Sequence, residues 1–216
     1  MAEMITLTID GRRVGAFEGE TVLEAARRVG IEIPTLCYHP ALTPYGACRL
    51  CVVEVEQRGR RRLVVSCLFP VEEGLVVWTD NERVRKARRG VMELLLARCP
   101  NVPAIRELAA KMGVKEPRFP LEDEGCILCG LCVRCCEEIS QAHAISFVSR
   151  GPKRRVATPF EEPSEVCIGC GGCAYLCPTG FIRIEDGFIK IGDRVIRELS
   201  PEDSRRVKDA LGAAEK

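Results

Sequence analysis

Two copies of one cysteine motif decide the fold of the second half of this sequence. Residues 126–136 read CILCGLCVRCC, and residues 167–178 read CIGCGGCAYLCP. Each copy has the spacing C-x2-C-x2-C-x3-C, and a proline follows the second copy at once. This run is typical of bacterial ferredoxins that bind two [4Fe–4S] clusters. Glycines inside the motifs allow the tight backbone turns that such a cluster requires. The two stretches therefore predict a two-cluster ferredoxin domain.

In ferredoxins of this kind, the fourth cysteine of each run ligates the other cluster. The sequence therefore predicts two ligand sets that each combine both motifs. They are Cys126, Cys129, Cys132 and Cys177 for one cluster, and Cys136, Cys167, Cys170 and Cys173 for the other. Cys135 stands beside Cys136, but the register of the two motifs favours Cys136 as the ligand. Zinc is the alternative, although structural zinc usually takes two cysteine pairs with a longer spacer between them.

A third group of four cysteines lies in the first half of the chain. Its members are Cys37, Cys48, Cys51 and Cys67. The spacing C-x10-C-x2-C-x15-C is similar to the plant-type [2Fe–2S] pattern, with a longer first gap. A zinc site with four cysteine ligands is the alternative here as well. We interpret the group as the ligands of one [2Fe–2S] cluster.

The residues around this third group predict a strand, a hairpin turn, a short helix and two further strands. The strands are expected at residues 5–9, 50–56 and 63–67, the hairpin turn at Asp10-Gly11 and the helix at 21–29. An arginine-rich turn at 58–62 separates the last two strands. Alternating apolar residues indicate the strands, and Gly30 marks the end of the helix. This order of elements is what a β-grasp ferredoxin domain needs.

Composition narrows the possible functions. The 216 residues include 32 basic and 31 acidic side chains, so a nucleic-acid binder with a strongly basic surface is not expected. We see neither a signal peptide nor an apolar run long enough for a membrane span. A reducing, cytoplasmic environment is therefore expected, in which the 14 cysteines stay reduced or bind metal.

The motifs together resemble one known family. The stretches PTLCYHP at 34–40, GACRLC at 46–51, SC at 66–67 and GCILCGLC at 125–132 are similar to the N-terminal iron–sulfur region of the large complex I iron–sulfur subunit. The same module occurs in the small diaphorase subunit of NAD-reducing hydrogenases, in NAD-dependent formate dehydrogenases and in many [FeFe]-hydrogenases. The resemblance implies electron relay between an NAD(P)H-oxidising flavoprotein and a catalytic partner such as a hydrogenase, a formate dehydrogenase or another reductase.

One stretch departs from the family pattern. The family normally carries a further [4Fe–4S] cluster, ligated by one His and three Cys, between the two ferredoxin parts. The matching residues 94–106 read LLLARCPNVPAIR, with one Cys and no His. We therefore expect that cluster to be absent and Cys99 to be a buried thiol. Apolar stripes at helical spacing predict two helices instead, which form a spacer.

The expected fold class is α+β: a β-grasp [2Fe–2S] domain, a helical spacer and a bacterial two-[4Fe–4S] ferredoxin-like domain. The predicted bounds are 1–80, 81–120 and 121–190, followed by a C-terminal tail with a short helix at 191–216. The expected cofactors are one [2Fe–2S] and two [4Fe–4S] clusters. No catalytic residue, dinucleotide motif or phosphate loop is recognised. We expect an electron-transfer subunit of an oxidoreductase complex; the alternatives are a diffusible polyferredoxin carrier and a zinc-binding interaction module.

Overall fold

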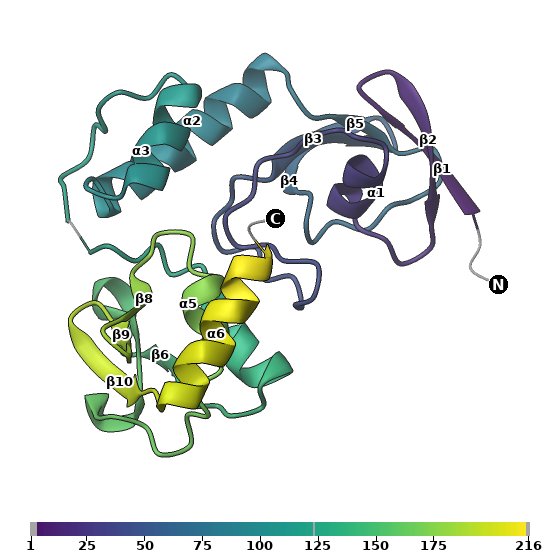
Figure 1. Cartoon of the computed structure of the whole chain (residues 1–216). Helices are drawn as coiled ribbons and strands as arrows, with labels where there is room; N and C mark the ends of the chain where they lie inside the picture. The colour runs from purple at the N-terminus through teal and green to yellow at the C-terminus, as the bar shows by residue number, and fades with distance from the viewer. Residues whose placement is uncertain (1–3, 123, 215–216) are drawn as a thin grey trace.

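The structure is a computed structural model that describes residues 4–122 and 124–214, with side chains at 208 and 210–214 left out. Residues 215–216 of the predicted tail lie outside this description. The chain forms three units in sequence order (Figure 1). A five-stranded sheet with one helix comes first, a pair of helices follows, and a unit of small sheets and short helices comes last.

The first unit has the predicted β-grasp arrangement. Its elements are β1 (Met4–Ile9), β2 (Arg12–Phe17), α1 (Val22–Arg28), β3 (Val52–Gln57), β4 (Arg60–Val65) and β5 (Val76–Trp78). The strand order is β2-β1-β5-β3-β4, with β1 parallel to β5 and the other neighbours antiparallel. Asp10 and Gly11 both have positive φ in the β1–β2 turn, as a tight hairpin requires.

Helix α1 begins with a capping box and packs against the sheet. The Thr21 side chain accepts a hydrogen bond from the Glu24 backbone, and Glu24 bonds back to the Thr21 backbone. The helix buries Leu23 and its neighbours against Leu7, Val53 and other residues of the sheet. This unit therefore has a core made mainly of aliphatic side chains, to which Cys51 and Cys67 also belong.

The second hairpin differs from its predicted form. The predicted turn at 58–62 and strand at 63–67 give way to a strand, β4, that already begins at Arg60. Only Arg58 and Gly59 form the turn, and both have positive φ. A two-residue turn of this kind matches the twist of the paired strands. Arg60, Arg61 and Arg62 therefore lie on an edge strand, where exposed charged side chains are common.

The predicted spacer consists of two packed helices. Helix α2 (Glu82–Arg98) begins at the cap Asn81, and α3 (Pro103–Lys111) follows after a short turn. In Figure 1 the two helices lie side by side above the last unit. Their apolar sides bury Met92, Leu96 and Ile105 in a core that also contains Cys37 and Cys129. The spacer thus fills the space between the two cysteine-rich regions.

The last unit contains both cysteine motifs, and each motif leads into a short helix. Its elements are α4 (Leu131–Arg134), a π-helical turn (Cys135–Ile139), β6 (Ser146–Val148), a 3-10 turn (Gly151–Lys153), β7 (Arg155–Ala157), a 3-10 turn (Pro159–Glu161), α5 (Gly172–Tyr175), β8 (Ile182–Glu185), β9 (Phe188–Ile191) and β10 (Arg194–Glu198). Strands β6 and β7 pair, and β8, β9 and β10 form a separate sheet. Gly130 and Gly171 precede α4 and α5 with nearly the same left-handed backbone, φ 73 and 72.

The predicted domain boundary at residue 190 falls inside β9. Strand β10 pairs with β9, so the sheet continues into the segment that was predicted as tail. Helix α6 (Pro201–Ala214) is the helix expected in the tail, and it lies across the front of the unit in Figure 1. The cysteine pattern does not indicate that β10 pairs with β9. Among the residues that the structure describes, no helix combines the length and apolar character needed to cross a bilayer.

Candidate iron–sulfur sites

The four cysteines of the first unit are buried and form two close pairs. The backbone N–H of Cys48 donates to Sγ of Cys37 at 3.4 Å, and the two thiols share a hydrogen bond. Cys51 and Cys67 share a hydrogen bond between their thiols in the same manner. A [2Fe–2S] cluster has two irons that four thiolates hold. The pairing therefore offers two sulfur atoms to each iron.

Within each pair the two thiols are not equivalent. A hydrogen bond from Cys48 lowers the pKa of Cys37, and one from Cys67 lowers the pKa of Cys51. The same hydrogen bonds, together with burial, raise the pKa of Cys48 and of Cys67. One sulfur of each pair is thus disposed to ionise, and the thiolate is the form that binds metal.

Three buried side-chain atoms lack a hydrogen-bond partner among the described residues, and all lie beside this site. They are Oγ of Ser66, Nε of Arg88 and Nε of Arg134. The Ser66 hydroxyl is close enough to Cys51 to lower its pKa. Arg88 donates to the carbonyl of Val52 at 2.9 Å, and Arg134 donates to that of Cys37 at 2.7 Å. Spare donors fit a negatively charged cluster whose sulfur atoms accept hydrogen bonds.

The first predicted [4Fe–4S] set draws its members from both motifs. Cys126 and Cys129 each interact electrostatically with Cys177 from the second motif, and so does Cys132. Backbone N–H groups approach two of the sulfur atoms: Leu128 donates to Cys126 and Ile182 donates to Cys177, both at 3.4 Å. Burial raises the pKa of Cys129 to about 12. The structure therefore brings these four predicted residues together.

The second predicted [4Fe–4S] set surrounds one internal cavity. Cys136, Cys167, Cys170 and Cys173 all line it, with Ala144 and Ile189 among the other lining residues. The backbone N–H of Ala144 donates to Sγ of Cys136 at 3.2 Å. Burial raises the pKa of Cys173 to about 12, whereas Cys170 is exposed. This set is therefore brought together at a place where one of its members reaches the surface.

Cys135 lies behind the second set. Its thiol is buried, and burial raises its pKa to about 11. The π-helical turn that starts here directs it to Gly172, where an added Cβ would lie 2.8 Å from the Cys135 sulfur. It does not line the cavity that Cys136 lines. The absence of a side chain at Gly172 thus makes room for Cys135 beside the cysteine loop.

Cys99 belongs to none of the three predicted ligand sets. It lies at the end of α2. It is fully buried in the core between α2 and α3, beside Leu96, Val102 and Ile105. The surroundings are apolar, which suits a buried thiol. The family pattern has a cluster ligated by one His and three Cys in this stretch. In this chain the stretch contributes packed apolar side chains.

The three sets follow one another through the molecule. Cys37 interacts electrostatically with Cys129, and both belong to the core beneath α2 and α3. Cys132 interacts with Cys173, and both belong to the core of the last unit. The first [4Fe–4S] set therefore lies between the other two sets, sharing one core with Cys37 and Cys48 and another with Cys173.

The long gap between the first two cysteines, residues 38–47, forms the contact between the outer units. The backbone N–H of Thr43 donates to Glu138 at 2.7 Å, and the carbonyl of Thr43 accepts from Arg134. Tyr45 stacks against Phe147, with ring centroids 6.2 Å apart. The residues that lengthen the plant-type spacing are thus those that attach the first unit to the last.

Arg88, Arg134 and Ser66 are the residues of the site that motif reasoning missed. Two of them carried a signal in the sequence. Arg134 is a charged residue inside a cysteine motif, and Arg88 interrupts the apolar stripe of α2 between Val84 and Met92. A cation at a position that faces the core needs a partner there. Nothing comparable marks Ser66.

Among the described residues, no three His, Cys, Asp or Glu side chains close around a point tightly enough for one metal ion. An iron–sulfur cluster instead accepts thiolates that are spread around several metal atoms.

Comparison with known proteins assigns both halves of the chain. Residues 2–82 match a 2Fe-2S iron-sulfur cluster binding domain, and residues 125–190 match a 4Fe-4S dicluster domain. The expected cofactors, one [2Fe–2S] and two [4Fe–4S] clusters, are thereby confirmed, as is the α+β fold class. The class of protein is an iron–sulfur protein that joins two types of ferredoxin domain.

A chain of an NAD+-reducing [NiFe]-hydrogenase, whose crystal structure is of the H2-reduced state, has 31% sequence identity and a TM-score of 0.61. The match covers 71% of this chain and 74% of that chain. The protein belongs to the family of the complex I large iron–sulfur subunit and its hydrogenase counterparts, as its motifs predicted.

Curated relatives share a similar identity over much of the chain. The NADP-reducing hydrogenase subunit HndD of Solidesulfovibrio fructosivorans is 37% identical over 82% of this chain, which is 35% of the relative. The NADPH-Fe(3+) oxidoreductase subunit alpha of Geobacter sulfurreducens is 37% identical over 82% of this chain and 24% of its own length. The match with this chain thus spans about a quarter to a third of these relatives.

Proposed function

We propose that this chain is an iron–sulfur electron-transfer subunit of a multisubunit oxidoreductase. It relays electrons between an NAD(P)H- or ferredoxin-linked flavoprotein and a catalytic partner, such as a hydrogenase, a formate dehydrogenase or another reductase. The observation that carries the proposal is the succession of three cysteine sets through two shared cores, from Cys37 through Cys129 and Cys132 to Cys173. The clusters supply one-electron chemistry when they are bound.

We assign the ligands as the motifs predict them. Cys37 with Cys48 and Cys51 with Cys67 hold one iron each of the [2Fe–2S] cluster. The two [4Fe–4S] clusters are held by Cys126, Cys129, Cys132 and Cys177, and by Cys136, Cys167, Cys170 and Cys173. The paired thiols of the first set and the shared cavity of the last support this assignment. We place the domains at 1–80, 81–120 and 121–199, since β10 belongs to the last sheet.

The protein's own residues hold and shield the clusters. Burial of Cys37, Cys48, Cys51 and Cys67 keeps water from the first site. Backbone N–H groups such as those of Leu128, Ala144 and Ile182 donate to the sulfur atoms of proposed ligands, an interaction that tunes iron–sulfur clusters. The proposal assigns no catalytic residue to this chain, and substrate chemistry belongs to its partners.

The exposed surface around Cys170 supports a fixed partner. Cys170 is exposed, and three large side chains near it are exposed by more than half: Val166 (60%), Ile168 (55%) and Tyr175 (54%). An apolar patch around an exposed ligand suits a protein interface that excludes water from the site of electron exchange. A cytoplasmic location follows from the same proposal, because reduced thiols persist there.

A diffusible polyferredoxin carrier is the second candidate. The net charge of +1 gives no strong electrostatic steering, which a freely diffusing carrier would use. Anaerobic native purification, with mass spectrometry of the proteins that accompany the chain, distinguishes the two. We expect a flavoprotein and a second redox subunit to travel with it. An iron-loaded chain that runs alone under gentle conditions would reject the fixed-subunit proposal in favour of the carrier.

The ligand assignment has its own test. Cys126→Ser should remove or alter one [4Fe–4S] signal in the electron paramagnetic resonance (EPR) spectrum and leave the [2Fe–2S] signal. Cys167→Ser should do the same to the other [4Fe–4S] signal. Cys135→Ser is the matched control, because this thiol is buried beside the site but is not assigned as a ligand. Two unchanged [4Fe–4S] signals in the first two variants would show the assignment to be wrong.

A further inference from the structure

Two buried arginines flank the proposed [2Fe–2S] site from opposite units. Arg88 comes from α2, and Arg134 comes from α4 of the last unit. Their exposed fractions are only 9% and 8%. Burial of a guanidinium is costly unless negative charge or hydrogen-bond acceptors surround it. Their position therefore requires an electrostatic partner.

Protein groups satisfy these two cations incompletely. Each donates to a carbonyl beside a predicted ligand: Arg88 to Val52, which follows Cys51, and Arg134 to Cys37 itself. Nε of each lacks a hydrogen-bond partner, and within the described residues neither forms an ion pair with a carboxylate. Each guanidinium thus lies beside the backbone of a predicted ligand with one buried N–H donor unused.

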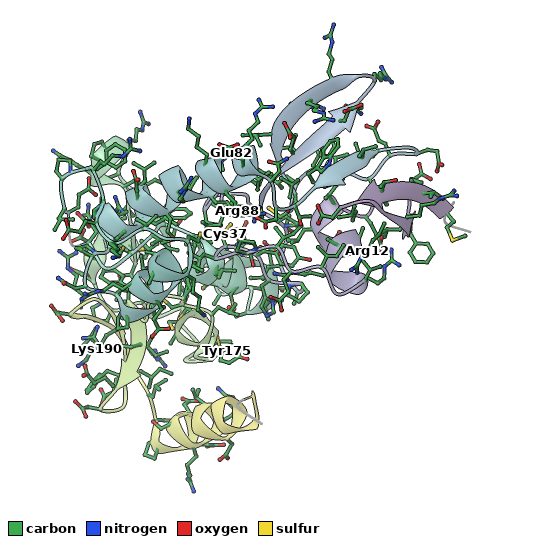
Figure 2. All side chains as sticks on the ribbon, turned by 90° about the horizontal axis from the view of Figure 1, so that it is seen from above. Arg12, Cys37, Glu82, Arg88, Tyr175 and Lys190 are labelled. Carbon is green, nitrogen blue, oxygen red and sulfur yellow. The ribbon has the colours of Figure 1, made fainter. Side chains whose placement is uncertain are left out.

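The two arginines interact with different thiol pairs of the site. Arg134 interacts electrostatically with Cys37, which belongs to one thiol pair. Arg88 interacts most strongly with the carboxylate of Asp80, next with Cys51, which belongs to the other pair, and then with Asp10. Figure 2 shows Arg88 on α2 above Cys37, whereas Arg12 lies at the far end of the first unit. Each proposed iron thus has one buried arginine near its thiolates.

We propose that Arg88 and Arg134 are positioning residues that raise the reduction potential of the [2Fe–2S] cluster. The inference rests on the proposed function, and it adds how this chain tunes its first redox site. Reduction adds one electron, taken from the donor, while no bond breaks and no proton moves. The added negative charge is stabilised by buried cations, because low dielectric strengthens their attraction. Net charge and hydrogen bonding are known determinants of cluster potential.

Arg134 has a second role in the same inference. It also donates to the carbonyl of Thr43, and its guanidinium lies 5.6 Å from the centre of the Tyr45 ring. These contacts hold the loop of residues 38–47 against the last unit. Arg134 therefore affects both the charge around the cluster and the placement of its loop, whereas Arg88 affects mainly the charge.

The test is a potentiometric titration of the full chain after anaerobic reconstitution with iron and sulfide, with dithionite as reductant. EPR follows the [2Fe–2S] and [4Fe–4S] signals separately. In Arg88→Met and in Arg134→Met we expect the equilibrium constant for reduction of the [2Fe–2S] cluster to fall about tenfold, which is 59 mV for one electron. The variants Arg88→Lys and Arg134→Lys should retain most of the wild-type potential. Arg12→Met should leave it unchanged.

A wild-type potential in Arg88→Met and Arg134→Met, with intact clusters, would overturn the inference. If Arg134→Met fails to assemble its clusters, the Arg88→Met potential decides by itself, because Arg88 does not attach the 38–47 loop. Lysine variants whose potential falls as far as that of the methionine variants would likewise reject a charge effect. Wild-type chain without iron and acid-labile sulfide would instead refute the proposed function, so the two failures are distinguishable.

Discussion

The first and the last unit bury their cysteines in different company. In the first unit, Cys51 and Cys67 are two of 16 buried core residues, and the others are aliphatic. In the last unit, Cys132 and Cys173 are two of only nine buried core residues, and Cys126, Cys136 and Cys177 pack against that core. Its strands β6 and β7 have only three residues each.

This difference teaches where the folding free energy comes from. A sheet with its own aliphatic core gains stability from burial of apolar area. A small unit with fewer buried aliphatic side chains and a larger share of thiols must gain more of its stability from metal binding, because metal-binding free energy is then folding free energy. The stability of the first unit therefore depends little on its cluster, whereas the stability of the last unit depends strongly on its two clusters.

The largest expected effect comes from removal of the clusters. In the iron-free chain, residues 124–199 should lose amide protection, whereas α1 and strands β1, β3 and β5 should keep most of theirs. The difference in local stability should be on the order of several kcal/mol. Hydrogen exchange with mass spectrometry, on iron-free and reconstituted chain, measures it. Equal loss of protection in both units would break the comparison.

An intermediate effect is expected at the glycine before α5. At Gly171, φ is +72, and an added Cβ would lie 2.8 Å from Val207 of α6. Gly171→Ala should lower the free energy of unfolding of the last unit by about 2–5 kcal/mol, from backbone strain together with overpacking. Urea denaturation followed by cluster absorbance measures this.

Gly187 provides the matched control for that substitution. Its φ is +81, but an added Cβ there would meet nothing within 4 Å. Gly187→Ala should therefore cost only the backbone term, about 1–2 kcal/mol. Equal costs at the two positions would show that the contact between α6 and the cysteine loop contributes no stability.

The smallest effect concerns the first unit and pH. Glu54 on β3 accepts hydrogen bonds from Arg83 at 2.6 Å and from Asn81 at 2.7 Å, and the first of these is the main cause of its lowered pKa. Because the folded pKa lies below the unfolded one, the stabilisation is fully present above about pH 4.5 and is lost as pH falls through the folded pKa.

Glu54→Gln should therefore reduce the free energy of unfolding of the first unit by roughly 1 kcal/mol at pH 7, since Arg83 is itself half exposed. The deficit should shrink toward pH 4. Urea denaturation of the iron-free chain at both pH values measures it without interference from the clusters. Glu56→Gln, which removes an exposed ion pair with Arg61, should cost less. A deficit that does not change with pH would contradict the role given to the carboxylate.

Much of the fold was predictable because its signals are local. The turn at Asp10-Gly11 and the helix predicted at 21–29 depend on neighbouring residues, and both are present, the helix at Val22–Arg28 with Thr21 as its cap. The strand pairing of β10 was missed, because pairing depends on residues that are close only after folding. The arginine-rich hairpin was misjudged for a related reason: an edge strand tolerates exposed charges.

The types of cluster site follow from the spacing of cysteines along the chain, since a cluster constrains its ligands within a few residues. Tertiary structure alone decided which sites touch and what surrounds them. The shared core of Cys37 and Cys129, the attachment of the 38–47 loop by Arg134 and the burial of Arg88 join residues dozens of positions apart. Long-range packing and the need to compensate buried charge brought these groups together, and no short motif records either.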